Sequence, residues 1–233
     1  MTPESTVRPP LDAKAGVLVL LRHGLSRLNA QGRFSGWADC PLAPEGVRQA
    51  HEAGRSLRAA SLAFDACFSS TLSRAADTAS IVLGDLELGT IPVTRAWRLN
   101  ERHYGALEGV SKKDAEERYG ADRVEAWRNG PDAVPPPLSP DDPRHPRRSP
   151  LYRGVAPELL PASECLRDAF RRVTGFFEEE IRPLVEAGKR VLVVSHGNPI
   201  RALVAHLEGR PEGYVPMIDI RNAEPIVYMQ DRP

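Results

Sequence analysis

The chain has 233 residues, of which 41% are hydrophobic and 27% charged, a globular composition sufficient for one large domain or two small ones. Lysine plus arginine equal aspartate plus glutamate at 31 each, so no net charge draws in nucleic acid or an anionic membrane. No apolar run approaches the roughly 20 residues of a membrane span. The cysteines, Cys40, Cys67 and Cys165, lack metal-ligand spacing. We therefore expect a soluble, cytoplasmic protein with a flexible leader at residues 1–14.

The first half of the chain alternates strand and helix patterns. Residues 15–23 form a nearly continuous Val- and Leu-rich run, typical of a strand covered on both faces. Residues 44–60 carry apolar residues at helical spacing, 64–70 predict a short strand, and 71–84 a helix. A strand is predicted at 91–99, followed by a charged helical segment at 111–130 that breaks at Gly120.

The second half opens with a segment that can be neither helix nor central strand, because residues 131–150 contain eight prolines. An amphipathic helix is predicted at 163–189, an apolar strand at 190–197, a helix at 198–209 and a last strand at 223–230. Alternating strands and helices predict a three-layer α/β sandwich, with a mostly parallel central sheet and helices on both faces. We expect a single domain over residues 15–233.

The two most apolar strands end in the same way, each in a histidine and a glycine. Ligands of open α/β sheets bind beyond the carboxyl ends of the strands, so neighbouring strands would bring His23 and His196 into one crevice. Each histidine has an arginine nearby in the sequence, Arg22 and Arg201, and neither lies in a cluster of metal ligands. Arginine and imidazole suit a phosphate better than a cation. A structural, hydrogen-bonded role for either histidine alone is the alternative.

Six segments in order carry a wider resemblance: LRHGLSRLN, RFSGW, SSTLSRAADTA, WRLNERHYGALEG, VPPP and SHGN. They resemble the cofactor-dependent phosphoglycerate mutases of the histidine phosphatase superfamily, from about residue 16 to 229. The resemblance implies the phosphoglycerate mutase-like fold and interconversion of 3-phosphoglycerate and 2-phosphoglycerate, in glycolysis and gluconeogenesis. It also implies a phosphohistidine intermediate, 2,3-bisphosphoglycerate as phosphoryl primer, and no metal.

The resemblance assigns roles to individual residues. It implies that His23 is the nucleophile, that Glu101 donates and accepts the proton, and that Arg22, Arg74 and His196 neutralise the transferred phosphoryl group. An exposed helical arginine is the alternative for Arg74. The implied contacts to substrate comprise Ser26, Asn29, Ser35, Gly36, Tyr104, Lys112, Arg128, Gly197 and Asn198. Arg102 and His103 are expected to be supporting residues.

The chain departs from the mutase pattern at three places. Leu25 stands where the family usually has Glu, Asn129 where it has a second Arg, and RNAEP at 221–225 where it has PTGIP. Losing one charge-assisted hydrogen bond should cost about 1–3 kcal/mol of affinity for the distal anionic group. A broad-specificity phosphatase acting on small phosphomonoesters is therefore an alternative, as is an inactive binding or regulatory relative. The complete set of catalytic residues argues against the inactive relative.

The proline-rich segment, about residues 130–160, is interpreted as a lid that keeps water from the phosphohistidine. Arg144, Arg147 and Arg148 would bring positive charge to a closed site, and a solvated basic turn is the alternative. The expected partners are small phosphorylated three-carbon acids, with neither nucleic acid nor membrane. Relatives are often dimers or tetramers, and the sequence leaves a homodimer or homotetramer open.

Overall fold

A computed structural model describes residues 7–8, 16–211 and 217–229 of the chain. Its centre is a six-stranded sheet in the order β1-β6-β2-β5-β3-β4. β6 runs antiparallel to β2, whereas the pairs β2–β5, β5–β3 and β3–β4 are parallel. The strands are β1 (Val7–Arg8), β2 (Val17–Arg22), β3 (Ala66–Ser69), β4 (Val93–Arg95), β5 (Arg190–Ser195) and β6 (Pro225–Met229).

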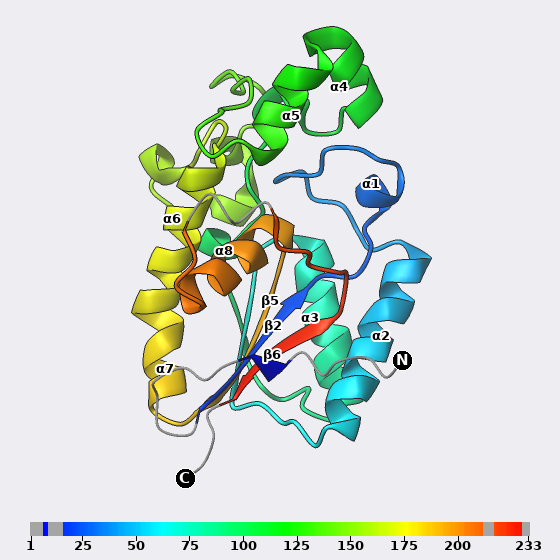
Figure 1. The fold of residues 1–233 in the computed structure, drawn as a ribbon, viewed down its shortest axis with the longest axis vertical. Helices are drawn as coiled ribbons and strands as arrows, with labels where there is room; N and C mark the ends of the chain where they lie inside the picture. The colour runs from blue at the N-terminus through cyan, green and yellow to red at the C-terminus, as the bar shows by residue number, and fades with distance from the viewer. Residues whose placement is uncertain (1–6, 9–15, 212–216, 230–233) are drawn as a thin grey trace.

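Helices cover both faces of the sheet, which gives the predicted three-layer α/β sandwich (Figure 1). α2 and α3 lie on one side, α6 and α8 on the other, and α4 and α5 lie beyond one end of the strands (Figure 1). The helices are α1 (Arg27–Ala30), α2 (Pro44–Ala59), α3 (Ser73–Asp85), α4 (Lys112–Tyr119), α5 (Ala121–Asn129), α6 (Leu166–Phe176), α7 (Arg182–Glu186) and α8 (Gly197–Leu207). The expected fold class is confirmed.

Alternate residues of β2 explain why both layers are needed. Leu18 and Leu20 are fully buried in a cluster with residues of α6 and α8. Val19 and Leu21 are fully buried in a second cluster with residues of α2 and α3. Because successive side chains of a strand point to opposite faces, an uninterrupted apolar run can be buried only between two layers.

Two predicted elements differ from the structure in extent. The strand expected at 91–99 is limited to β4 and continues as a 3₁₀ helix, η1 (Trp97–Leu99). The helix expected at 163–189 contains a π-helical turn, η6 (Phe177–Ile181), between α6 and α7. Pro183 near the start of α7 has no amide hydrogen to donate, and the π turn precedes it. The break predicted at Gly120 separates α4 from α5, where Gly120 has a φ of +88°.

The proline-rich segment folds into short turns: η3 (Pro146–Arg148), η4 (Pro150–Tyr152) and η5 (Pro157–Leu159). Another 3₁₀ turn, η2 (Gly105–Leu107), precedes it in the chain. Tyr152 is buried, and its hydroxyl accepts a hydrogen bond from Asn100 Nδ2 at 2.8 Å. The segment thus packs on the loop that follows β4. Of the expected leader, Val7–Arg8 pair with β6 as β1, and residues 1–6 and 9–14 lie outside the described residues.

Candidate active site

The ends of β2 and β5 bring the two histidines together. The strands are parallel, and Arg22 lies opposite Ser195, so the next residue of each strand is a histidine. The ring centroids of His23 and His196 are 4.9 Å apart, at an interplanar angle of 63°. Both rings are buried. The structure therefore places them in one crevice, as the matching strand ends predicted.

His23 is held as a neutral imidazole with one ring nitrogen unprotonated. Its Nδ1 lies 2.6 Å from the carbonyl oxygen of Gly24, which assigns the proton to Nδ1 and the lone pair to Nε2. Arg74 Nε donates to that Nε2 at 3.3 Å. Burial, together with the charges of Arg74 and Arg22, holds the pKa of His23 well below 6.5. An unprotonated Nε2 is the form that can attack phosphorus.

The second histidine is held by the hydroxyl of Ser70. Ser70 Oγ lies 2.7 Å from His196 Nε2 and also accepts the amide hydrogen of Leu72 at 3.2 Å. The hydroxyl hydrogen of Ser70 is then left for Nε2, which assigns the His196 proton to Nδ1. That Nδ1 is buried and has no hydrogen-bond partner among the described residues. Burial, then the charge of Arg74, keeps the pKa of His196 well below 6.5.

Arg74, at the start of α3, is fully buried and is anchored by a backbone loop. Its Nη2 donates to the carbonyl of Gly36 at 2.7 Å and its Nη1 to that of Ala38 at 3.1 Å. Gly36 has a φ of +49°, and a Cβ there would lie 2.1 Å from Glu108 Oε1, so the loop requires glycine. Burial raises the pKa of Glu108 to about 8. The loop therefore rests on a carboxyl that is largely uncharged at neutral pH.

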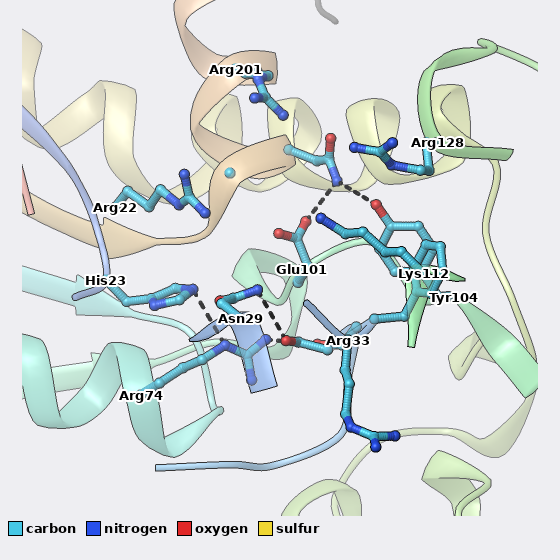
Figure 2. A pocket seen from close by; sticks show the side chains of 15 residues that line it. Arg22, His23, Asn29, Arg33, Arg74, Glu101, Tyr104, Lys112, Arg128 and Arg201 are labelled. Atoms are coloured by element: carbon cyan, nitrogen blue, oxygen red, sulfur yellow. Dashed lines mark hydrogen bonds between the residues drawn. The ribbon is translucent and has the colours of Figure 1, made fainter. Parts of the chain in front are cut away.

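A cavity of about 190 Å³ opens beside His23. The positively charged residues that line it are Arg22, Arg33, Arg74, Lys112, Arg128 and Arg201, with Glu101 the one acidic residue among the lining side chains. Figure 2 shows Arg22, His23, Arg74 and Asn29 at one end, Tyr104, Lys112 and Arg128 at the other, and Glu101 between them. Such a cavity favours an elongated substrate with an anionic group at each end.

Glu101 presents one carboxylate oxygen to the cavity. Its Oε1 accepts hydrogen bonds from the amide of Arg102 at 2.8 Å and from Asn198 Nδ2 at 3.0 Å. A Cβ built on Gly197 would lie 3.8 Å from Glu101 Oε2 and equally far from Arg22 Nε. Arg22 Nε is itself buried without a partner among the described residues. Glu101 Oε2 and an unsatisfied guanidinium N–H thus both lie near the start of α8.

Of the predicted substrate-binding set, Ser26 is the residue that does not line the cavity. Its hydroxyl caps α1 by accepting the amide hydrogen of Asn29 at 3.2 Å, and it donates to Asn29 Oδ1 at 2.8 Å. Asn29 Nδ2 in turn donates to Ser35 Oγ at 3.2 Å. Ser26 therefore orients Asn29, which does line the cavity. The other members of the set all line the cavity, whereas His196 contacts the ring of His23 and is not among the lining residues.

The departures from the mutase pattern have distinct structural settings. Leu25 is not among the residues that line the cavity, and its amide donates to Gln49 Oε1 at 2.9 Å. Asn129 is turned away, with its Nδ2 donating to Glu125 Oε1 at 2.5 Å. The missing second arginine is thus not replaced at this position by another ligand-facing group.

The altered C-terminal segment directly supports the backbone at the end of β2. Asn222 Nδ2 donates to the carbonyl of His23 at 2.7 Å, and the amide of Ala223 donates to the carbonyl of Arg22 at 2.9 Å. Ala223 keeps a φ of +52°, a left-handed conformation that glycine adopts more readily. The segment RNAEP therefore still braces the end of β2.

Two arginines of the cavity lay outside the predicted site set. Arg201 is one helical turn after Gly197, and this spacing places both on one face of α8. Its Nε donates to the carbonyl of Ile218 at 2.7 Å. Arg33 contributes to the cavity wall, but its guanidinium points away from the centre and donates to the carbonyl of Gly109 at 2.7 Å (Figure 2).

The arginines of the proline-rich segment do not line this cavity. Arg144 forms two hydrogen bonds to Asp142, and its Nη1 donates to the carbonyl of Glu108 at 3.3 Å. Arg148 pairs with Asp141 at 3.0 Å. Among the described residues there is no group of three His, Cys, Asp or Glu side chains that could hold a metal ion. Nor does the described part contain a helix with the length and hydropathy to cross a membrane.

Comparison with known proteins places this geometry in a family. Residues 18–231 match the model of the histidine phosphatase superfamily, branch 1. The chain belongs to this superfamily. The expected resemblance is confirmed by two curated relatives named 2,3-bisphosphoglycerate-dependent phosphoglycerate mutase. The protein from Nitratidesulfovibrio vulgaris is 47% identical over 92% of this chain and 86% of its own length. The protein from Nautilia profundicola is 45% identical over 92% of this chain and 93% of its own.

Solved structures with this fold include a mutase and phosphatases. A phosphoglycerate mutase from Bacillus anthracis is 25% identical, with a TM-score of 0.66 over 93% of this chain and 89% of that one. An alpha-ribazole phosphatase from Shigella flexneri is 25% identical, with a TM-score of 0.68 over 93% and 94% of the two chains. A mycobacterial glucosyl-3-phosphoglycerate phosphatase is 27% identical, with a TM-score of 0.66 over 91% and 90%. The fold of this superfamily member therefore does not by itself distinguish a phosphoryl-transfer enzyme from a phosphatase.

Proposed function

We propose that this member of the histidine phosphatase superfamily is a 2,3-bisphosphoglycerate-dependent phosphoglycerate mutase, an isomerase that interconverts 3-phosphoglycerate and 2-phosphoglycerate. The observation that carries the proposal is the neutral His23, with its unprotonated Nε2 beside Arg74 at one end of a cationic cavity. The two mutase relatives at 45–47% identity support the choice of reaction. Its place would be cytoplasmic glycolysis and gluconeogenesis.

The phosphoryl group would be transferred in line to His23. The Nε2 lone pair forms the new N–P bond while the P–O bond to the substrate oxygen breaks. Arg22 Nε and His196 Nδ1, both buried without partners among the described residues, supply donors for the phosphoryl oxygens. Arg74 supplies further positive charge from a fixed position. Donors that need not reorganise are the most effective stabilisers of developing charge.

Glu101 would pass the proton. When the P–O bond breaks, the departing oxygen takes a proton from Glu101 Oε2, and in the reverse transfer the attacking hydroxyl returns it. Oε1 is already occupied by Arg102 N and Asn198 Nδ2, so Oε2 is the oxygen available for exchange. The location of Glu101 between the two ends of the cavity suits a hydroxyl next to either phosphorylated carbon (Figure 2).

The far end of the cavity would bind the carboxylate or second phosphate of the substrate. Lys112 and Arg128 line it with Tyr104, whose hydroxyl lies 3.5 Å from Asn198 Nδ2. The unsatisfied donors near His23 and the cations at the far end fit a ligand that carries two anionic groups. Bound 2,3-bisphosphoglycerate would supply the phosphoryl group that primes the enzyme.

We also propose that residues 15–233 act as one catalytic domain and that residues 130–160 exclude water as a lid. Exclusion of water separates transfer to a second hydroxyl from hydrolysis of the phosphohistidine. The anchoring of Tyr152 to Asn100 ties this segment to the loop that carries Glu101. Arg144 and Arg148 form ion pairs with Asp142 and Asp141 of the same segment, so closure over the cavity would require them to leave these partners.

The test is a product ratio. The wild-type protein, given 3-phosphoglycerate and a trace of 2,3-bisphosphoglycerate, should form 2-phosphoglycerate far faster than inorganic phosphate. Acid-labile phosphate should be trapped on the wild type and not on His23→Ala. Release of phosphate that exceeds isomerisation even with primer present would overturn the mutase assignment, and undiminished labelling of His23→Ala would overturn the nucleophile.

A broad phosphatase is the second candidate. Asn129 is bonded to Glu125 and turned away from the cavity, which leaves the far end with Arg128 alone of the expected arginine pair. Structural relatives named as phosphatases share the fold. On this reading the same phosphohistidine is formed, and water takes the place of the second hydroxyl. The product ratio above separates the two candidates.

A further inference from the structure

One buried guanidinium donates hydrogen bonds to several backbone carbonyls of the loop that carries Glu101. Arg172 lies on α6, and its side chain is 7% exposed. Its Nη1 and Nη2 donate to four backbone carbonyl oxygens of the loop. These are Arg98 at 2.8 Å, Asn100 at 3.1 Å, Glu101 at 3.2 Å and Trp97 at 3.4 Å.

Glu164, the ion-pair partner of Arg172, hydrogen-bonds the same loop at His103, beyond Glu101. Glu164 is 5% exposed and receives two hydrogen bonds from Arg172, at 2.7 and 2.8 Å. Its Oε2 also accepts the amide hydrogen of His103 at 2.9 Å, and its own amide donates to the carbonyl of His103 at 2.9 Å. The Arg172–Glu164 pair thus fixes the backbone before and after the acid–base residue.

The carbonyl of Glu101 itself is held from two directions. Arg172 Nη2 donates to it, and so does Trp37 Nε1 at 2.5 Å. The Arg172 guanidinium also lies 5.5 Å from the centroid of the Trp37 ring. No sheet ladder restrains this stretch, because β4 ends at Arg95. Hydrogen bonds from the Arg172 side chain therefore restrain the backbone of this stretch, as strand pairing restrains it elsewhere in the sheet.

We propose that Arg172, held by Glu164, is the positioning residue for Glu101. The proposal rests on the proposed function, in which Glu101 gives its proton to the substrate oxygen as the P–O bond breaks and His23 Nε2 takes the phosphoryl group. A proton can pass only at about 2.6–3.2 Å between oxygens, and a displacement near 1 Å costs about a hundredfold in rate. Arg172 touches no substrate and acts through the carbonyl of Glu101.

Leaving-group dependence tests this role. Arg172→Lys keeps a positive charge beside Glu164, but an ammonium has three N–H donors where a guanidinium has five. We expect phosphorylation of His23 by 2,3-bisphosphoglycerate to slow at least about thirtyfold, because an alkoxide needs a proton to leave. With p-nitrophenyl phosphate as donor, the rate should change less than about threefold, because nitrophenolate leaves unprotonated.

A double-mutant cycle separates positioning from general damage. Glu101→Gln alone should give the same dependence on leaving group. In Glu101→Gln/Arg172→Lys, the second change should slow transfer less than about threefold further, because its effect passes through Glu101. Arg171→Lys, a change at the exposed neighbour of Arg172, is the matched control and should leave both rates unchanged.

The outcomes are separable. Two results would overturn the positioning role and show general damage to the site. One is equal slowing with both phosphoryl donors, and the other is a double variant whose rate loss equals the product of the losses in Glu101→Gln and Arg172→Lys. Should Arg172→Lys fail to fold by circular dichroism, Glu164→Gln with the same two donors decides the question, with the same expected selectivity. A wild-type protein that forms no 2-phosphoglycerate would overturn the proposed function, and that result is independent of every variant.

Discussion

The neutral state of His23 can be measured through protein stability. The ring is 2% exposed, and burial beside Arg74 and Arg22 holds its pKa well below 6.5. In the unfolded chain the same imidazole takes up a proton as pH falls through about 6.5. The unfolded state then binds more protons than the folded state, so the free energy of unfolding falls with falling pH. Between pH 7.0 and 5.5 one such histidine accounts for a loss of about 1 kcal/mol.

The perturbation is His23→Asn, whose amide can still donate to the carbonyl of Gly24. This variant lacks the titrating ring, so its stability should depend less steeply on pH than that of the wild type. The difference between the two proteins should change by about 1 kcal/mol between pH 7.0 and 5.5, to the disadvantage of the wild type at pH 5.5. Urea unfolding of dephosphorylated protein at both pH values measures it. A difference that stays constant would mean that His23 is protonated alike in both states and would refute the neutral nucleophile.

Three further variants probe the walls of the site. Gly36→Ala should lower the free energy of unfolding by about 2 kcal/mol or more, because of left-handed strain and the clash with Glu108. The control Gly32→Ala, at a φ of +65° with open space around it, should lower it by only about 1 kcal/mol, and equal losses would contradict the clash. The wild type should lose about 2 kcal/mol of unfolding free energy between pH 6 and 8, because the folded state favours the protonated Glu108 carboxyl, whose pKa is raised to about 8. Glu108→Gln should remove this loss, and an equal loss in the variant, measured by urea unfolding at both pH values, would contradict the assignment. Asn129→Arg should lower KM for 3-phosphoglycerate about threefold to tenfold by adding a charge-assisted hydrogen bond at the far end of the cavity, and an unchanged KM in steady-state assays would show that this position does not reach the substrate.

The central layers of the fold could be predicted because their patterns have one physical solution. The apolar runs of β2 and β5 can be buried only under helices on both faces, and two parallel strands ending in His-Gly must present those residues at one edge. Strand length was less predictable. β4 stops at Arg95 because its neighbour β3 ends at the paired Ser69, a limit set by another segment of the chain.

The side chains that contact the backbone were the least predictable part of the site. Arg172 is one of several arginines on an amphipathic helix, and its carbonyl partners lie in a loop about 70 residues earlier in the sequence. Ser26 matched a ligand-binding position, yet its short side chain is spent on capping α1 and holding Asn29. Motif spacing records which residues occur near a site, whereas the hydrogen-bond partner of each depends on the completed fold.

The pairing of β2 has a consequence for synthesis of the chain. Both edges of this apolar strand are covered by β5 and β6, which are the last strands to be made. While the ribosome works through the intervening residues, the nascent polypeptide carries Val17–Arg22 with neither neighbour available. Unpaired apolar strand edges associate readily with other chains. Chaperone capture of nascent polypeptides that stop short of residue 190 should therefore be strong, and it should fall sharply once β5 and β6 have emerged.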